Sequence, residues 1–174
     1  MVGGTGPEST ISYYRAVIAG VQATEGSHSL PPLVIESLSV FEVLGFCSRD
    51  HYDGLAGYLL SAIERLATVG AEVVTLTGLT PHIVFDQLSS KSPVPLISAV
   101  ETTRDAALER GVGRLALLGT EYTMTQDFFA RPLRDAGLEV VTPSQTEIAY
   151  IQDKIVSELE HGIVTDETHD GFVA

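Results

Sequence analysis

The chain has 174 residues, of which 44% are hydrophobic and 19% are charged, so it is long and apolar enough to bury a core. Its 23 acidic and 10 basic residues give a net charge of −13, which argues against nucleic acids and anionic membranes as partners, because both select clustered Lys and Arg. No apolar run reaches the roughly 18 residues of a membrane span. The single cysteine, Cys47, excludes an intramolecular disulfide and a cysteine-based zinc site, and its simplest context is a reducing cytoplasm.

Apolar runs of strand composition alternate with helical patterns along the whole chain. Strands are expected at residues 33–38, 72–76, 94–98, 114–118 and 138–141. Helices are expected over about 7–22, 52–69, 81–89, 99–110, 124–135 and 146–160. Within 52–69, apolar residues recur three and four apart, which is typical of a helix packed on a core. The alternation predicts repeated βα units and therefore an α/β fold with a parallel sheet.

The only candidate for an internal domain boundary is Pro93-Val94-Pro95, although these prolines could equally start a strand. It divides the chain into a first domain at 1–96 and a second at 97–174. Met1-Val2 leads directly into a glycine turn, where this architecture normally has a full strand in front of the turn. Residues 162–174 are polar and without periodicity, so we expect a solvated, frayed tail. Both ends suggest an incomplete chain.

The expected helices begin with capping signals. Ser98-x-x-Glu101, Thr123-x-x-Gln126 and Ser144-x-x-Glu147 fit the capping box, and Thr80-Pro81 fits an N-cap followed by proline. Each start follows a strand, so these loops should gather at the carboxyl edge of the sheet, where free N–H groups favour small anions. Capping alone could explain each signal. Together with the hydroxyls of the loops, they predict a carboxylate or phosphate pocket lined by Thr5, Thr77, Thr80, Thr120 and Thr123.

Other motifs are weaker. The segment Gly4–Ser9 resembles a dinucleotide fingerprint only superficially, and no Gly-Lys-Ser/Thr follows for a P-loop. Cys47 is interpreted as incidental. His82 falls in the first turn of a helix near the expected pocket, where it should be neutral; it could donate a hydrogen bond or be purely structural. The acidic residues and histidines of 161–170 lack ligand spacing, so no metal site is expected.

Several segments together carry a family resemblance. They are Gly3-Gly4-Thr5-Gly6-Pro7-Glu8-Ser9-Thr10, Thr80-Pro81-His82-Ile83-Val84-Phe85-Asp86, Pro95-Leu96-Ile97-Ser98, Leu117-Leu118-Gly119-Thr120-x-x-Thr123-Met124 and Ile151-x-x-Lys154-Ile155-x-x-Glu158-Leu159. In this order and spacing they resemble the aspartate/glutamate racemase family, over nearly the whole chain. The resemblance implies two similar three-layer, Rossmann-like α/β domains with the substrate between them. It also implies racemisation without pyridoxal phosphate or any other cofactor, by two cysteines on opposite faces of the substrate.

Site residues follow from this resemblance by matching position. Thr77 occupies the place of the first cysteine, and His82 is the only titratable candidate near it in sequence. Substrate contacts are implied for Thr5, Thr80, Thr120, Thr123 and Lys154, the last as the partner of a substrate carboxylate. Leu79 replaces an asparagine usual in the family's loop. The family's second cysteine belongs to a later Gly-Cys-Thr-Glu segment, which this sequence does not contain.

The sequence therefore predicts an amino-acid racemase or epimerase that is independent of pyridoxal phosphate. An acidic amino acid such as aspartate or glutamate is the expected substrate of the full-length parent. Two alternatives remain open at this point: a catalytically inactive homologue that binds a small carboxylate, and a truncated fragment. The expected partners are a small amino acid or dicarboxylate and, because incomplete sheets expose apolar surface, a second copy in a homodimer.

Overall fold

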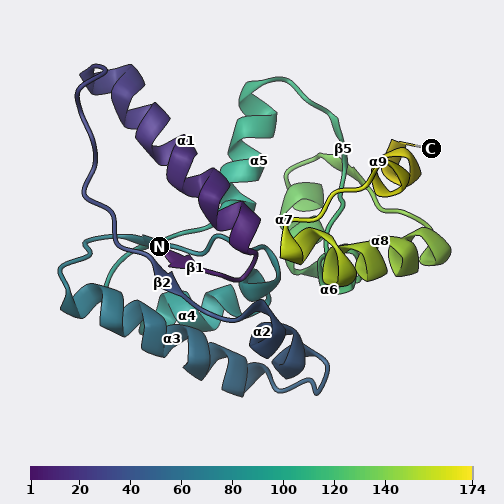
Figure 1. Cartoon of the computed structure of the whole chain (residues 1–174), viewed down its shortest axis with the longest axis horizontal. Helices are drawn as coiled ribbons and strands as arrows, with labels where there is room; N and C mark the ends of the chain where they lie inside the picture. Colours follow the sequence, from purple (N-terminus) through teal and green to yellow (C-terminus); the bar gives the residue numbers. More distant parts are fainter. Residues whose placement is uncertain (174) are drawn as a thin grey trace. The chain divides into compact units, whose positions relative to one another are not determined.

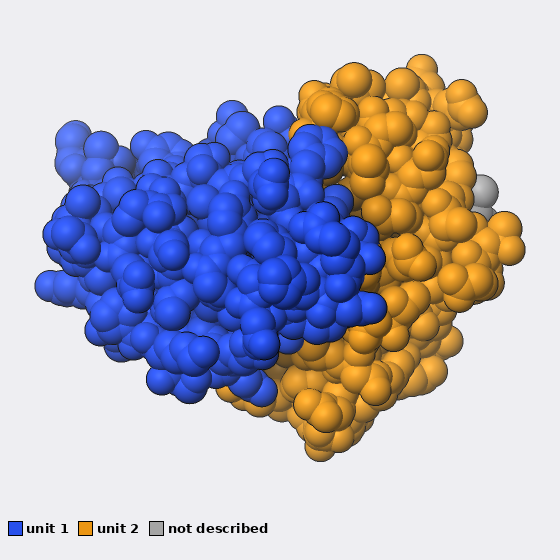
Figure 2. Space-filling model, turned by 90° about the horizontal axis from the view of Figure 1, so that it is seen from below, with its two compact units in different colours: residues 1–97 blue, residues 98–174 orange. Residues whose placement is uncertain are grey.

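The computed structural model describes residues 1–173, which form two compact units, Met1–Ile97 and Ser98–Ala174 (Figure 2). The elements of unit 1 are β1 (Val2–Gly3), α1 (Pro7–Glu25), β2 (Glu36–Ser37), α2 (Val40–Cys47), α3 (Tyr52–Thr68), β3 (Val74–Thr75), the 3-10 helix η1 (Thr80–Val84), α4 (Phe85–Lys91) and β4 (Leu96–Ile97). Those of unit 2 are α5 (Ala99–Glu109), β5 (Arg114–Ala116), α6 (Glu121–Thr125), α7 (Asp127–Asp135), β6 (Glu139–Val141), α8 (Gln145–Ser157), the 3-10 helix η2 (Leu159–His161) and α9 (Asp166–Val173).

The strands of unit 1 run parallel in the order β2-β1-β3-β4. Val2 pairs with Glu36 on one side, and a parallel bridge from Val2 to Leu76 connects β1 to the end of β3. On the far side, Val74 pairs with Leu96. In Figure 1, α1 lies on the opposite side of β1 from α3. Helices on both faces of a parallel sheet are the arrangement that the βα alternation predicts.

Helix α3 supplies much of the core of unit 1. Its apolar residues recur at helical spacing, and Leu55, Leu59 and Ile63 are fully buried. They belong to the same buried core as Val2 and Leu76 of the sheet. Burying a leucine or isoleucine side chain stabilises a fold by roughly 1.5–3 kcal/mol each. The sequence prediction of a core-packed helix over this segment is confirmed.

Unit 2 is built on one parallel pair, with Leu115 opposite Val140 in strands β5 and β6. A separate apolar cluster of Met124, Ile148 and Ile151 joins α6 to α8. Ser144 begins α8 with a complete capping box: Glu147 N–H donates to its hydroxyl at 3.5 Å, and Glu147 Oε2 accepts from the Ser144 N–H at 2.7 Å. Helix α8 therefore starts where the sequence predicts.

Several sequence expectations are corrected. The strands have two or three residues, because an apolar run signals burial and does not require that every residue pairs. The helix expected over 124–135 is split by Gln126, whose backbone is extended at φ −92° and ψ 148°. The tail expected to fray instead forms α9, in which Thr168 is 2% exposed. Thr168 makes buried contacts that a periodicity search over a polar segment cannot detect.

Two capping predictions are also wrong in detail. Thr123 lies inside α6, and Thr120 is the residue that caps this helix, with its hydroxyl accepting from Thr123 N–H at 3.4 Å. Thr80 begins a 3-10 helix and its side chain does not cap it. At Ser98 the prediction is correct for the first of the two capping-box bonds, since its hydroxyl accepts from Glu101 N–H at 3.2 Å.

Candidate functional site

In unit 1 the glycine turn after β1 lies against the loop after β3. Gly78 approaches Thr5 so closely that a Cβ on residue 78 would come within 2.2 Å of the Thr5 carbonyl oxygen. Gly4 and Gly6, with φ of 75° and 126°, shape the turn in conformations that L side chains rarely adopt. The carboxyl ends of two adjacent parallel strands thus bring Thr5 and the Thr77 segment together, as the sequence predicts.

Thr77, at the position of the family's first cysteine, is held by a network of hydroxyl groups. Its Oγ1 lies 2.8 Å from Thr10 Oγ1, and its carbonyl accepts from Ser9 Oγ at 2.5 Å. Thr10 Oγ1 accepts from the Gly4 N–H at 2.9 Å and lies 3.0 Å from the Gly6 carbonyl oxygen, which can accept its proton. Either hydroxyl could be the donor in the bond between Thr10 and Thr77. The Thr77 hydroxyl, 2% exposed, connects the loop after β3 to the turn after β1 through Thr10.

Thr5 behaves differently. Its Oγ1 is buried and has no hydrogen-bond partner among the described residues, although the residue is only 6% exposed. Thr5 directly precedes the Gly6 N-cap of α1, and this helix start lacks a side-chain cap. A buried hydroxyl without a partner costs about 1–3 kcal/mol, so such groups generally have a partner in the functioning molecule. A helix N-terminus is favourable for an anionic one.

His82 is 3% exposed and contacts the backbone of the loop after β3. Its Nδ1 lies 3.1 Å from the Gly78 carbonyl oxygen, which can only accept, so the Nδ1 atom carries the proton. The ring stacks on Phe85 with centroids 5.2 Å apart. Burial lowers the pKa of His82, and hydrogen bonds to the backbone of Gly78 and Leu79 oppose this only in part. The imidazole is therefore neutral near pH 7 and orients the Gly78 peptide.

Thr80 is 6% exposed in the first turn of η1. Cys47, the last residue of α2, is 1% exposed. Burial, and to a lesser degree the charge of Asp50, raises the pKa of the Cys47 thiol to about 11, so it stays protonated and unreactive at neutral pH. The interpretation of Cys47 as incidental agrees with this environment.

In unit 2, Thr120 and Thr123 form one hydroxyl pair, with their Oγ1 atoms 3.2 Å apart at the start of α6. Lys154 is in the last turn of α8, and its ammonium donates to Glu158 Oε1 at 2.5 Å. This partner raises the pKa of Lys154, which is charged at any physiological pH. Glu158 is part of the sequence motif that contains Lys154 but was given no role, although its spacing of four residues from Lys154 is a visible signal for an ion pair on a helix.

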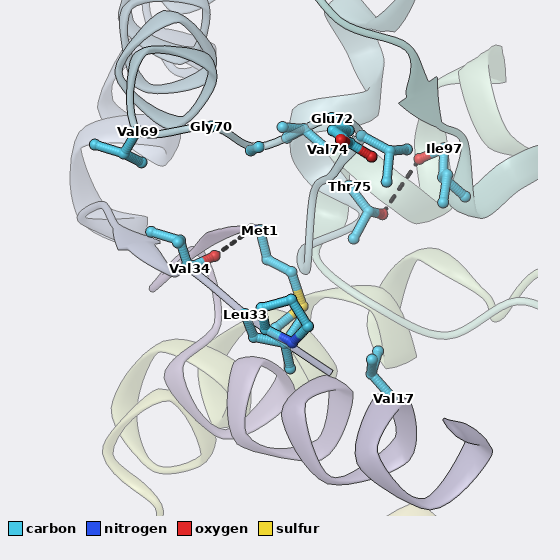
Figure 3. A pocket seen from close by; sticks show the side chains of 13 residues that line it. Met1, Val17, Leu33, Val34, Val69, Gly70, Glu72, Val74, Thr75 and Ile97 are labelled. Carbon is cyan, nitrogen blue, oxygen red and sulfur yellow. Dashed lines mark hydrogen bonds between the residues drawn. The ribbon is translucent and has the colours of Figure 1, made fainter. Parts of the chain in front are cut away.

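One groove in unit 1 is unrelated to these residues. It has a volume of about 510 Å³ and is mainly apolar, with Met1, Leu33, Val34, Val69 and Val74 among its lining residues (Figure 3). Most of its lining precedes β1, β2 and β3 in sequence, so it lies at the amino ends of the strands. The threonine network lies at their carboxyl ends.

Among the described residues, no group of three His, Cys, Asp or Glu side chains could hold a metal ion. Within 1–173, the structure also has no helix both long and apolar enough to cross a membrane.

Comparison with known proteins gives consistent matches over almost the whole chain. The family model described as Asp/Glu/Hydantoin racemase matches residues 2–173. A crystal structure from Yersinia pestis, assigned as an Asp/Glu racemase, is 30% identical with a TM-score of 0.82, covering 98% of this chain and 75% of that one. An aspartate racemase homologue from Pyrococcus horikoshii is 34% identical with a TM-score of 0.77, covering 97% of this chain and 74% of that one.

A more distant structure, the aspartate racemase of Picrophilus torridus, is 14% identical with a TM-score of 0.68, and covers 97% of this chain and 84% of that one. At this identity it supports the fold alone. It agrees with the α/β class and the short parallel strands described above. By the match over residues 2–173 and by the identity to the Yersinia and Pyrococcus structures, the chain belongs to the Asp/Glu/Hydantoin racemase family.

Proposed function

We propose that this protein is an amino-acid racemase or epimerase that acts on an acidic amino acid, aspartate or glutamate, without pyridoxal phosphate. Membership of the racemase family supports the reaction class, and the relative described as an aspartate racemase homologue supports the substrate class. The observation in this chain that carries the proposal is the buried Thr5 hydroxyl, which has no partner among the described residues and adjoins the start of α1.

The proposed binding residues are those that the family resemblance implies, and contacts within each unit assign positioning roles to Thr77 and His82. Thr5 and Thr80 in unit 1, and Thr120, Thr123 and Lys154 in unit 2, bind the carboxylates and stabilise the negative charge that develops when the Cα proton leaves. Thr77 is a positioning residue, because its buried hydroxyl is bonded to that of Thr10. His82 is likewise a positioning residue, because it is neutral and donates to the Gly78 carbonyl. Units 1 and 2 correspond, in this proposal, to domains at 1–96 and 97–174.

The test is proton exchange at Cα. We expect the Cα–H signal of L- and D-aspartate or glutamate to fade in D₂O at a rate proportional to protein concentration. Saturable line broadening without exchange would contradict the racemase and favour a non-catalytic carboxylate-binding homologue, which the comparisons do not favour. Absence of both would contradict any carboxylate site. Activity that survives treatment with hydroxylamine, which removes pyridoxal phosphate, is expected if the reaction needs no such cofactor.

Thr5→Val provides a sharper version of this test. The substitution replaces an unsatisfied buried hydroxyl with a methyl group of the same shape, so the fold should be unchanged or slightly more stable. Loss of a hydrogen bond to a charged ligand should weaken aspartate binding about tenfold. Thr24→Val, on the exposed part of α1, is the matched control and should change neither property. Unchanged aspartate affinity in Thr5→Val would remove Thr5 from the binding site.

We further propose that the protein is a cytoplasmic homodimer. Its one cysteine is a buried, protonated thiol, which suits a reducing compartment. Apolar side chains such as Leu30 and Val69 are 68% and 64% exposed, and self-association is a common way to cover such surface. Light scattering coupled to size exclusion should give twice the monomer mass, and a strictly monomeric species at high concentration would contradict the dimer.

A further inference from the structure

The C-terminal helix α9 is connected to Lys154 through one carboxylate, that of Glu158. Glu158 Oε1 accepts from Lys154 Nζ at 2.5 Å, and its other oxygen, Oε2, accepts a short hydrogen bond from Thr168 Oγ1 in α9. The Thr165 hydroxyl donates to Thr168 Oγ1 at 3.0 Å, and Thr165 Oγ1 accepts from the Thr168 N–H at 3.1 Å. These four residues, which we call the Glu158 clamp, form a directed chain from the Thr165 hydroxyl to the carboxylate.

The clamp fixes Glu158 from both sides. A free lysine–glutamate pair four residues apart on a helix contributes little, because both side chains are mobile in water. Here the Lys154 and Glu158 side chains are only 16% and 17% exposed, and Thr168 is 2% exposed. A carboxylate that also accepts a buried hydroxyl hydrogen bond cannot turn away from the ammonium without leaving that hydroxyl without a partner.

Packing between α8 and α9 reinforces this arrangement. The Tyr150 ring lies under the Lys154 ammonium at 5.9 Å and contacts Phe172 of α9, with ring centroids 6.1 Å apart. Gly171 is pressed against this ring, since a Cβ there would come within 2.1 Å of the Tyr150 hydroxyl oxygen. The Tyr150 ring, which belongs to the same helix as Lys154, thus limits the movement of the ammonium on one side. Glu158 holds the ammonium by its opposite charge.

We propose that Glu158, anchored by the hydroxyl of Thr168, is a positioning residue for Lys154 that presents its ammonium in one fixed direction to a carboxylate ligand. An ammonium has three N–H donors, and Glu158 accepts one of them, which leaves two to point elsewhere. The claim that the ammonium binds a carboxylate ligand rests on the function proposed above. The claim that Glu158 fixes the position of the Lys154 ammonium does not depend on that function.

The sequence makes the ammonium directly observable. The chain has two lysines, Lys91 and Lys154, so a sample labelled with ¹⁵N-lysine gives two side-chain signals, and the exposed Lys91 is an internal control. We expect a slowly exchanging Lys154 ammonium signal at neutral pH in the full chain. Glu158→Gln should abolish it and lower the pKa of Lys154, because the hydrogen bond to Glu158 is the main cause that raises it.

Thr168→Val tests the anchor without changing the charge. We expect a weaker Lys154 signal and about threefold or greater loss of L-aspartate affinity, because one hydrogen bond from a neutral hydroxyl contributes a modest free energy. Thr168→Ser retains the hydroxyl and should restore both properties. Glu160→Gln, which removes the same charge two residues away, should leave the Lys154 signal intact. Circular dichroism of each variant checks that α8 and α9 remain folded.

The outcomes separate the two proposals. A Lys154 signal and pKa that are unchanged in Glu158→Gln would overturn the clamp. A lost signal with unchanged aspartate affinity in Thr168→Val would overturn the positioning role and leave the proposed function standing. Absence of aspartate binding by the unmodified chain would contradict the proposed function, while the Lys154 signal still decides whether Glu158 positions the ammonium.

Discussion

The candidate site residues of the two units are held by different kinds of interaction. In unit 1, Thr77 and Thr10 connect two loops by neutral hydroxyl-to-hydroxyl and hydroxyl-to-backbone bonds in a buried setting. In unit 2, the central contact joins two full charges, Lys154 and Glu158, near the surface and at the end of a helix. Neutral buried bonds respond to changes of shape, whereas charged contacts respond to pH and salt. Substitution and titration should therefore affect the two groups differently.

The largest effect is expected for Gly78→Ala. A Cβ at this position would lie 2.2 Å from the Thr5 carbonyl oxygen, which is backbone and cannot move aside cheaply. We expect a loss of about 3 kcal/mol in unfolding free energy, near the upper end for a single substitution. Gly57→Ala in α3, where nothing lies within 4 Å, is the control and should stabilise by up to about 1 kcal/mol. Urea denaturation measures both, and similar effects at the two glycines would show that the loops do not touch.

Thr77→Val should have the next largest effect. Valine has nearly the same shape but removes the hydrogen bond to Thr10 Oγ1, so we expect a loss of about 1–2 kcal/mol from this buried pair. Thermal or urea denaturation measures the loss. Thr68→Val, exposed at the end of α3, should cost much less. An effect no larger than that of the control would mean that the network does not hold the loops.

The two units should also differ in their response to pH. Burial lowers the pKa of His82 below its ordinary 6.5, so the folded state resists protonation that the unfolded state accepts. Stability should therefore be complete above pH 6.5 and fall as the pH decreases toward the folded pKa. We expect His82→Asn, which retains a donor for Gly78, to reduce this acid sensitivity in melting curves. The same acid sensitivity in the variant would show that His82 is not its source.

In unit 2 the ion pair of Lys154 and Glu158 should be stable over a wider range of pH. The Lys154 ammonium and the Thr168 hydroxyl lower the pKa of Glu158 below its ordinary 4.5, and Glu158 raises that of Lys154 above its ordinary 10.5. The contact should persist from about pH 4.5 to about pH 10.5, and weaken as pH falls through the folded pKa of Glu158 or rises through that of Lys154. Hydrogen exchange of α9 measures this, and protection of α9 that is independent of pH would contradict the clamp.

The smallest effect is expected for Ser144→Ala, which removes the capping box of α8. Loss of an N-cap costs about 1 kcal/mol, and here it should loosen the first turn of the helix that carries Lys154. Denaturant titration measures the change. Ser157→Ala at the other end of α8, where the hydroxyl bonds only to the carbonyl of Asp153, is the control. Equal effects of the two substitutions would contradict the cap.

Much of the fold could be predicted from the sequence, because α3 and α8 have strong apolar periodicity and α8 also has a capping box. Strand lengths could not be predicted, because an apolar run indicates that residues are buried and does not show which of them pair in a sheet. The break at Gln126 could not be predicted either, because it depends on backbone angles that no residue type dictates. Helix α9 was missed because its one buried anchor, Thr168, is polar and its partner Glu158 lies ten residues earlier. Only tertiary contact reveals such a pair.

The residues of the candidate site could be predicted from the sequence, but the role of each residue was harder to predict. The glycine turn and the threonines could be found from motifs, and the structure brings Thr5 and the Thr77 segment together. The bond between the Thr77 and Thr10 hydroxyls was not predictable, because it depends on how the turn after β1 meets the loop after β3. Thr10 stood in the quoted glycine-turn motif, but its spacing of 67 residues from Thr77 gives no sequence signal.

The most direct test of the account is the isotopic and chiral fate of L-aspartate incubated with this chain in D₂O. Chiral separation with mass detection should find D-aspartate carrying one deuterium at Cα, formed in proportion to protein concentration and reduced in Thr5→Val. Binding of L-aspartate without any D-enantiomer and without deuterium at Cα would contradict the proposed racemase.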